Sequence, residues 1–165
     1  MTPEEKELEE IFNESKTILE ESGITPATID RLRINPKTTS RFGRCRIYPD
    51  GRREIEISEK VLSEGSHNGK LTVMIHEMLH ALPGCADHRS KWKHYAEIVN
   101  MNNPNLCIKR TNTYGDIGIK TNESKYVIAC TCCGAEFART RLTKAVQHPE
   151  NYVCGVCGGK LKRIK

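Results

Sequence analysis

The 165-residue chain contains no apolar run of about 18 residues or more, the length that a membrane-spanning helix needs, so we expect no membrane span. Its N-terminal stretch is acidic and lacks the apolar core and the small-residue cleavage site of a secretory signal. It also has no internal repeat and no low-complexity tract. These absences argue against the membrane, secreted and repeat classes. They predict a cytoplasmic protein, or a nuclear one in a eukaryotic host.

The first 125 residues carry no net charge, because their 19 Lys and Arg residues match 19 Asp and Glu residues. The net charge of +5 therefore comes entirely from residues 126–165. A basic terminal module favours a polyanionic partner such as nucleic acid. Charge alone leaves a solvated basic tail as the alternative.

Four of the eight cysteines form two CxxC pairs, each followed by glycine: Cys130 with Cys133, and Cys154 with Cys157. In a reducing compartment, clustered thiols are metal ligands more often than disulfides. Two such pairs predict a closed tetrahedral zinc site with a structural role. A redox CxxC is the alternative, but that motif normally stands alone at a helix start. A module of this size buries little surface, so we expect zinc to supply most of its stability.

The run HEMLH lies in a predicted helix over residues 70–82, which Pro83 and Gly84 end. His76 and His80 are four residues apart and therefore share one helix face, where both can bind one zinc ion. Glu77 flanks the pair, and its carboxylate can take a proton from a zinc-bound water and pass it to the leaving amine. The pattern predicts a catalytic metal site.

A catalytic zinc needs a third protein ligand and an open position. His88, beyond the Pro83–Gly84 break, is the leading candidate. His94 and Glu97, in a second predicted helix over residues 89–100, are the alternatives. Asp87, next to His88, can instead orient a ligand imidazole by a hydrogen bond.

Local patterns predict the other elements of the chain. Alternating residues around a Pro49-Asp50-Gly51 turn predict a β-hairpin from residues 41–48 and 53–58. Between residues 25 and 40 the signals are mixed and favour at most a short helix bracketed by Pro26 and Pro36. The remaining expected segments are a helix over 3–21, a short helix from Ser58 to Leu62, and a loop from Gly65 to Gly69.

The HEMLHAL run, followed by His88, Trp92 and Asn100, resembles the SprT-like (Spartan-like) zinc metallopeptidase family. The resemblance extends to the hairpin with Gly43, to the strand with Ile55, and to the four-cysteine ribbon that many members carry. It implies zinc at His76, His80 and His88 and catalysis by Glu77. It also implies an α+β fold, with a small zincin-like metalloprotease domain followed by a zinc ribbon. The expected boundaries are residues 1–108 for the metallopeptidase domain, 109–124 for a linker and 125–165 for the ribbon.

The expected nucleic-acid contacts are basic residues of the ribbon, namely Arg139, Arg141, Lys144, Lys160, Lys162 and Arg163. Three ribbon aromatics can stack on exposed bases or can form the ribbon's small core: Tyr126, Phe137 and Tyr152. The hairpin adds five arginines: Arg41, Arg44, Arg46, Arg52 and Arg53.

Three functions remain open at this point. The leading one is a monomeric, zinc-dependent endopeptidase that associates with DNA in the cytoplasm or nucleoid and cleaves DNA-bound or DNA-crosslinked proteins, with one catalytic and one structural Zn²⁺. The second is a cytosolic metallopeptidase with no nucleic-acid role. The third is a non-enzymatic DNA-binding zinc protein, against which Glu77 argues because a structural site needs no base.

Overall fold

The computed structural model describes residues 1–38, 41–120 and 124–165, and the chain divides into two units, Met1–Lys120 and Thr121–Lys165. The architecture mixes helices and sheets, as the α+β prediction expects. The predicted linker, 109–124, overlaps the first unit as far as residue 120, and its residues 121–123 lie outside the described part. In the described ranges, no helix is both long enough and apolar enough to cross a membrane.

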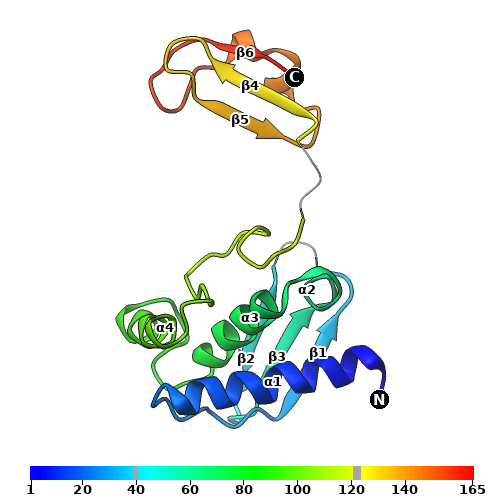
Figure 1. Cartoon of the computed structure of the whole chain (residues 1–165), viewed down its shortest axis with the longest axis vertical. Helices are drawn as coiled ribbons and strands as arrows, with labels where there is room; N and C mark the ends of the chain where they lie inside the picture. The colour runs from blue at the N-terminus through cyan, green and yellow to red at the C-terminus, as the bar shows by residue number, and fades with distance from the viewer. Residues whose placement is uncertain (39–40, 121–123) are drawn as a thin grey trace. The chain divides into compact units, whose positions relative to one another are not determined.

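The first unit packs helices against a three-stranded sheet in which β1 and β3 are parallel and β2 and β3 antiparallel, in the order β1-β3-β2 (Figure 1). Its strands are β1 (Arg31–Asn35), β2 (Gly43–Ile47) and β3 (Arg53–Ser58). Its helices are α1 (Pro3–Glu21), α2 (Glu59–Glu64), α3 (His67–His80) and α4 (Ser90–Asn102). Alternation along β3 sends Ile55 and Ile57 into the core beneath the helices. The intervening glutamates therefore point to the opposite face.

The structure confirms the strongest local predictions and corrects two others. Helix α1 spans the predicted residues with a capping box at Thr2 and Glu5, and the β2–β3 hairpin forms as expected. The loop predicted from Gly65 to Gly69 is wrong in its second half, because α3 begins at His67 with the Ser66 side chain accepting a hydrogen bond from the Gly69 N–H. The short helix between Pro26 and Pro36 is also wrong, since strand β1 forms there and pairs with the distant β3.

Helix α3 is the centre of the first unit's core. Three of its side chains, Met74, Ile75 and Leu79, are completely inaccessible to solvent, and most of their neighbours are buried too. Such an all-round apolar helix is stable only when other elements surround it. The polar side chains that α3 carries therefore sit in a rigid setting.

The segment after α4 packs onto the first unit rather than linking it to the second. Its Ile117 and Ile119 are buried in the core cluster, and the Ile117 carbonyl accepts a hydrogen bond of 3.0 Å from the Ser66 N–H. A methyl group on Gly69 would lie 2.1 Å from that same oxygen. The start of α3 and this segment thus meet backbone to backbone.

The second unit is a small antiparallel sheet in the order β5-β4-β6. It consists of β4 (Tyr126–Cys130), β5 (Glu136–Arg139), β6 (Leu161–Arg163), the short helix α5 (Lys144–Gln147) and the 3-10 turn η1 (Pro149–Asn151). Its buried apolar residues are few: Ile128, Ala129 and Val146, beside the thiols of Cys130 and Cys154. A core of this size needs a further source of stability, as the sequence predicts.

Substituting Gly69→Ala tests the packing between α3 and the segment after α4 that contains Ile117. Because the new methyl group meets the Ile117 backbone, the first unit must shift, and we expect a loss of about 1–3 kcal/mol in unfolding free energy. Thermal denaturation measures the change. Gly115→Ala is the control, since its methyl group would find only the Thr113 hydroxyl, at 3.8 Å. Equal stability of the two variants would contradict this packing.

Candidate metal centre

Three imidazole nitrogens converge on one point at the end of α3. The Nε2 atoms of His76 and His80 are 3.2 Å apart, and each lies 3.0 Å from the Nε2 atom of His88. Helix α3 supplies the first two, one turn apart, and the loop before α4 supplies the third. Nitrogens bound at 2.0–2.1 Å to one tetrahedral ion lie about 3.3 Å from each other. The three histidines can therefore hold a metal ion, as a group, without rearrangement.

A hydrogen bond to His80 and the burial of all three rings favour the form of each imidazole that can bind a metal. The Nδ1 atom of His80 lies 2.7 Å from the Cys85 carbonyl oxygen, so Nδ1 donates and Nε2 keeps its lone pair for the centre. Burial, followed by the charges of the two other rings, lowers the pKa of His76 to about 3. Burial likewise lowers the pKa values of His80 and His88. All three rings are thus neutral near neutral pH, the form that binds metal.

Trp92, the single tryptophan of the chain, forms the wall behind the three rings. Its ring centroid lies 4.7 Å from that of His76, 5.5 Å from His80 and 4.6 Å from His88, and it stacks on the His80 ring. The indole is almost completely buried. It restricts how far each imidazole can turn, and its fluorescence is placed to report on an ion bound there.

Glu77 lies beside the histidine group and faces strand β2. Burial raises the pKa of its carboxyl to about 8, against the opposing effects of a backbone hydrogen bond from Cys45 and the charge of Arg41. A methyl group on Gly43 would lie 2.8 Å from the Glu77 Cγ atom. Glycine at position 43 therefore leaves the room that the Glu77 side chain occupies.

Two adjoining hollows give access to this group, and both are lined by Gly43, His76 and Glu77. The smaller, of about 250 Å³, is also bordered by Arg41 and Arg110. The larger, of about 500 Å³, continues past three further residues of the site: Cys45, His80 and His88. A ligand lying along β2 can thus reach both the imidazoles and the carboxylate.

The alternative ligands suggested by the sequence lie elsewhere. His94 and Glu97 are exposed on α4 and do not belong to the histidine group. Asp87 accepts a hydrogen bond from the Arg89 N–H and forms an ion pair with the Arg89 guanidinium instead of orienting an imidazole. The orienting group is the Cys85 carbonyl, which sequence reasoning missed because a backbone oxygen leaves no mark in the sequence.

The four paired cysteines of the second unit also converge. The Sγ atoms of Cys130 and Cys157 are 3.5 Å apart, and those of Cys133 and Cys154 are 3.7 Å apart. Sulfurs at about 2.3 Å from one tetrahedral ion would be about 3.8 Å apart, so this set fits a closed metal site. Backbone N–H groups of Cys133 and Cys132, in that order of effect, lower the pKa of Cys130 to about 6, which favours the thiolate.

The predicted nucleic-acid contacts are all exposed in the second unit: Arg139, Arg141, Lys144, Lys160, Lys162 and Arg163. The guanidinium of Arg163 lies 4.8 Å from the centre of the Tyr126 ring. Tyr152 is exposed, whereas Tyr126 and Phe137 are half-buried, so only the first has the exposure that base stacking needs.

Comparison with known proteins links the histidine-bearing unit to one family. The SprT-like family model matches residues 8–112. The protein named "Protein SprT-like" from Bacillus velezensis is 27% identical over 114 residues, and its namesake from Bacillus subtilis is 26% identical over 113 residues. Each alignment covers 67% of this chain and 69% of the relative. The family match includes the three histidines and Glu77 and ends before the four cysteines.

Metal analysis tests whether the two groups are separate sites. We expect two ions per chain after loading with zinc, because both groups have tetrahedral spacing. His76→Ala should remove one ion and abolish the quenching of Trp92 fluorescence by added Co²⁺. His94→Ala, the control on the exposed side of α4, should keep both ions. An unchanged metal content in His76→Ala would contradict the assignment.

Proposed function

Because the chain belongs to the SprT-like family, we propose that it is a zinc-dependent endopeptidase with a zincin-like catalytic unit. The observation that carries the proposal is the meeting of three neutral imidazoles beside a buried carboxylate in an accessible cleft. Four-cysteine sites are closed, whereas three histidines leave a fourth position open for substrate chemistry. The four cysteines then hold a structural zinc.

In this proposal, His76, His80 and His88 would hold a zinc ion, which would act as a Lewis acid, lowering the pKa of a water to about 7 and polarising the scissile carbonyl. Glu77 takes the proton of the attacking water and delivers it to the leaving amine. The Cys45 N–H fixes the direction of the carboxylate. The narrow space beside Gly43 keeps the side chain next to the histidines.

Strand β2 is suited to hold the substrate. It pairs with β3 along one edge, and Gly43, Cys45 and Ile47 line the larger hollow. An extended peptide can add to such a strand through main-chain hydrogen bonds, which place its carbonyl groups without selecting a sequence. The smaller hollow, with Arg41 and Arg110, gives that end of the cleft a positive charge.

We further propose that the enzyme acts on proteins that are bound or crosslinked to DNA. Support comes from the six exposed cationic side chains of the second unit and from the concentration of the net charge there. DNA would then gather enzyme and substrate on one polymer. A nucleoid-associated, monomeric enzyme in the cytoplasm follows as a prediction. A peptidase that is indifferent to nucleic acid is the second candidate, since the first unit carries no net charge and contains the whole histidine site.

Glu77→Gln tests the enzymatic role. The amide keeps the shape of the side chain but cannot take the proton, so we expect cleavage of a DNA-binding protein to fall by about 10²–10⁴-fold while both zinc ions remain. Gel-based cleavage assays with the zinc-loaded protein measure it, with and without added DNA. Equal cleavage by wild type and variant would refute the proposed peptidase activity. If added DNA does not change the cleavage rate, the DNA-associated role is refuted and the second candidate, a peptidase without a nucleic-acid role, is supported.

Gly43→Ala tests whether the room beside Glu77 matters. The methyl group would displace the carboxylate without touching a metal ligand, so we expect kcat to fall by up to about 100-fold with two zinc ions retained. Gly115→Ala, in the same unit, should keep wild-type kcat. A Gly43→Ala enzyme with full activity would show that Glu77 does not need its observed position.

A further inference from the structure

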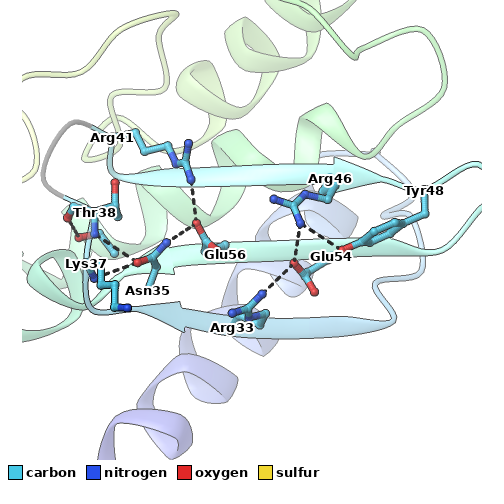
Figure 2. Close-up of polar contacts among 10 residues, drawn as sticks. Arg33, Asn35, Lys37, Thr38, Arg41, Arg46, Tyr48, Glu54 and Glu56 are labelled. Carbon is cyan, nitrogen blue, oxygen red and sulfur yellow. Dashed lines mark hydrogen bonds and ion pairs between the residues drawn. The ribbon is translucent and has the colours of Figure 1, made fainter.

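The face of the first unit's sheet that points away from the helices is rich in arginine, and Figure 2 shows three of these side chains, Arg33, Arg41 and Arg46. Register places Arg31 and Arg46 on either side of Glu54, and Arg33 and Arg44 on either side of Glu56. Two rows of arginine, glutamate and arginine therefore cross the three strands. None of these side chains belongs to the three-histidine group, although Arg44 also borders the larger hollow beside it.

Two buried glutamates, Glu54 and Glu56, lie beneath the arginines of this face. Glu54 is 4% and Glu56 is 7% exposed, although both carry a carboxylate. Glu54 lies 3.7 Å from nitrogens of both Arg31 and Arg33 and 4.0 Å from Arg46. Burial acts to raise the pKa of Glu56, but hydrogen bonds from Asn35 and Arg41 outweigh it and leave the pKa lowered. Both acids thus lie beneath the arginines and form ion pairs with them.

The arginines themselves remain open to solvent. The side chain of Arg31 is 67% exposed, and those of Arg33 and Arg41 are 43% and 45% exposed. Arg44 is exposed as well, and in the described ranges it forms no ion pair. A guanidinium has five N–H donors, so an arginine held by one carboxylate oxygen still presents donors outward.

The charge on this face is not balanced. Five arginines (31, 33, 41, 44 and 46) stand over two glutamates, which leaves three positive charges uncompensated. Residues two apart on a strand are about 7 Å apart, and the outer strands are separated by about 10 Å. The result is a flat grid of fixed, outward-facing donors. Planar guanidinium groups in such an array match the oxygens of successive phosphates.

We propose that this sheet face, defined by Arg31, Arg33, Arg41, Arg44 and Arg46, binds the phosphate backbone of nucleic acid. The inference rests on the proposed association with DNA and adds a contact in the catalytic unit to that of the four-cysteine unit. The contact is to phosphates and therefore independent of base sequence. It would hold the catalytic unit itself against the nucleic acid that carries the substrate.

The test uses the full zinc-loaded chain with Arg31, Arg33 and Arg44 all changed to Gln. This triple variant neutralises the face, while Arg46 stays beside Glu54 and Arg41 beside Glu56, so the buried acids keep a partner. Fluorescence anisotropy with labelled single-stranded and duplex DNA, over a range of salt, reports affinity. We expect a loss of about tenfold or more at low salt, and a log–log salt slope lower by about 2–3.

Two controls separate charge position from net charge and from folding. Lys6→Gln, Lys16→Gln and Lys93→Gln together remove the same charge from exposed positions on α1 and α4, and should change the slope far less. Changing Arg31, Arg33 and Arg44 to Lys instead should restore most of the affinity. Unchanged binding by the triple Gln variant would overturn the inference, as would an equal loss in the α1 and α4 control.

The outcome is separable from that of the proposed function. A variant with only Arg31 and Arg33 changed to Gln should cleave a DNA-free protein substrate at the wild-type rate, because these two residues line neither hollow, whereas Arg44 borders the larger one. Wild-type binding to DNA with no effect of the triple variant refutes this face alone. Absence of any DNA binding by the wild-type chain would refute both this inference and the DNA-associated role. The cleavage assay with Glu77→Gln would then still decide whether the chain is a peptidase.

Discussion

The meeting of three imidazole lone pairs at one point is the constraint on which the first unit depends. Nitrogens 3.0–3.2 Å apart repel when all are unprotonated, and a bound cation turns that repulsion into attraction. Until an ion binds, the surroundings must hold the rings in place. The helical turn between His76 and His80, the Cys85 carbonyl behind His80 and the Trp92 wall do so. These supports explain why α3 is buried on nearly all sides and why a compact loop follows it.

Burial also shifts the pKa of the carboxyl that lies beside the histidines. Placing Glu77 on the core side of the cleft removes its carboxyl from water, and this burial raises its pKa to about 8. Glycine at position 43 is required because any larger residue would take the space of that side chain. On the other face of the sheet, Glu54 and Glu56 are also buried, but arginines surround them. The first unit thus has two kinds of buried acid: Glu77, on helix α3, faces the cleft beside the histidines, and Glu54 and Glu56, on strand β3, lie beneath a cationic surface.

Sequence reasoning predicted what local chemistry determines and missed what distant contacts determine. Helix α1, the β2–β3 hairpin and the two ligand groups follow from caps, turns and ligand spacing within short stretches. Strand β1 exists because it pairs in parallel with β3, and nothing near Arg31 indicates a partner more than twenty residues away. Similarly, Ile117 and Ile119 lie in a polar stretch that reads as a linker, but they fill the core beside α3. The Cys85 carbonyl acts through its backbone, which any residue could supply.

X-ray absorption at the zinc edge tests the central claim most directly, because it reports the atoms bound to the metal. A chain with one three-histidine site and one four-cysteine site should show two ligand shells of similar population. Nitrogen or oxygen should lie at about 2.0–2.1 Å and sulfur at about 2.3 Å. In a variant with Cys130 and Cys154 changed to Ser, the sulfur shell should disappear while the imidazole signal stays. A spectrum of sulfur ligands alone in the wild-type chain would contradict a metal centre at His76, His80 and His88.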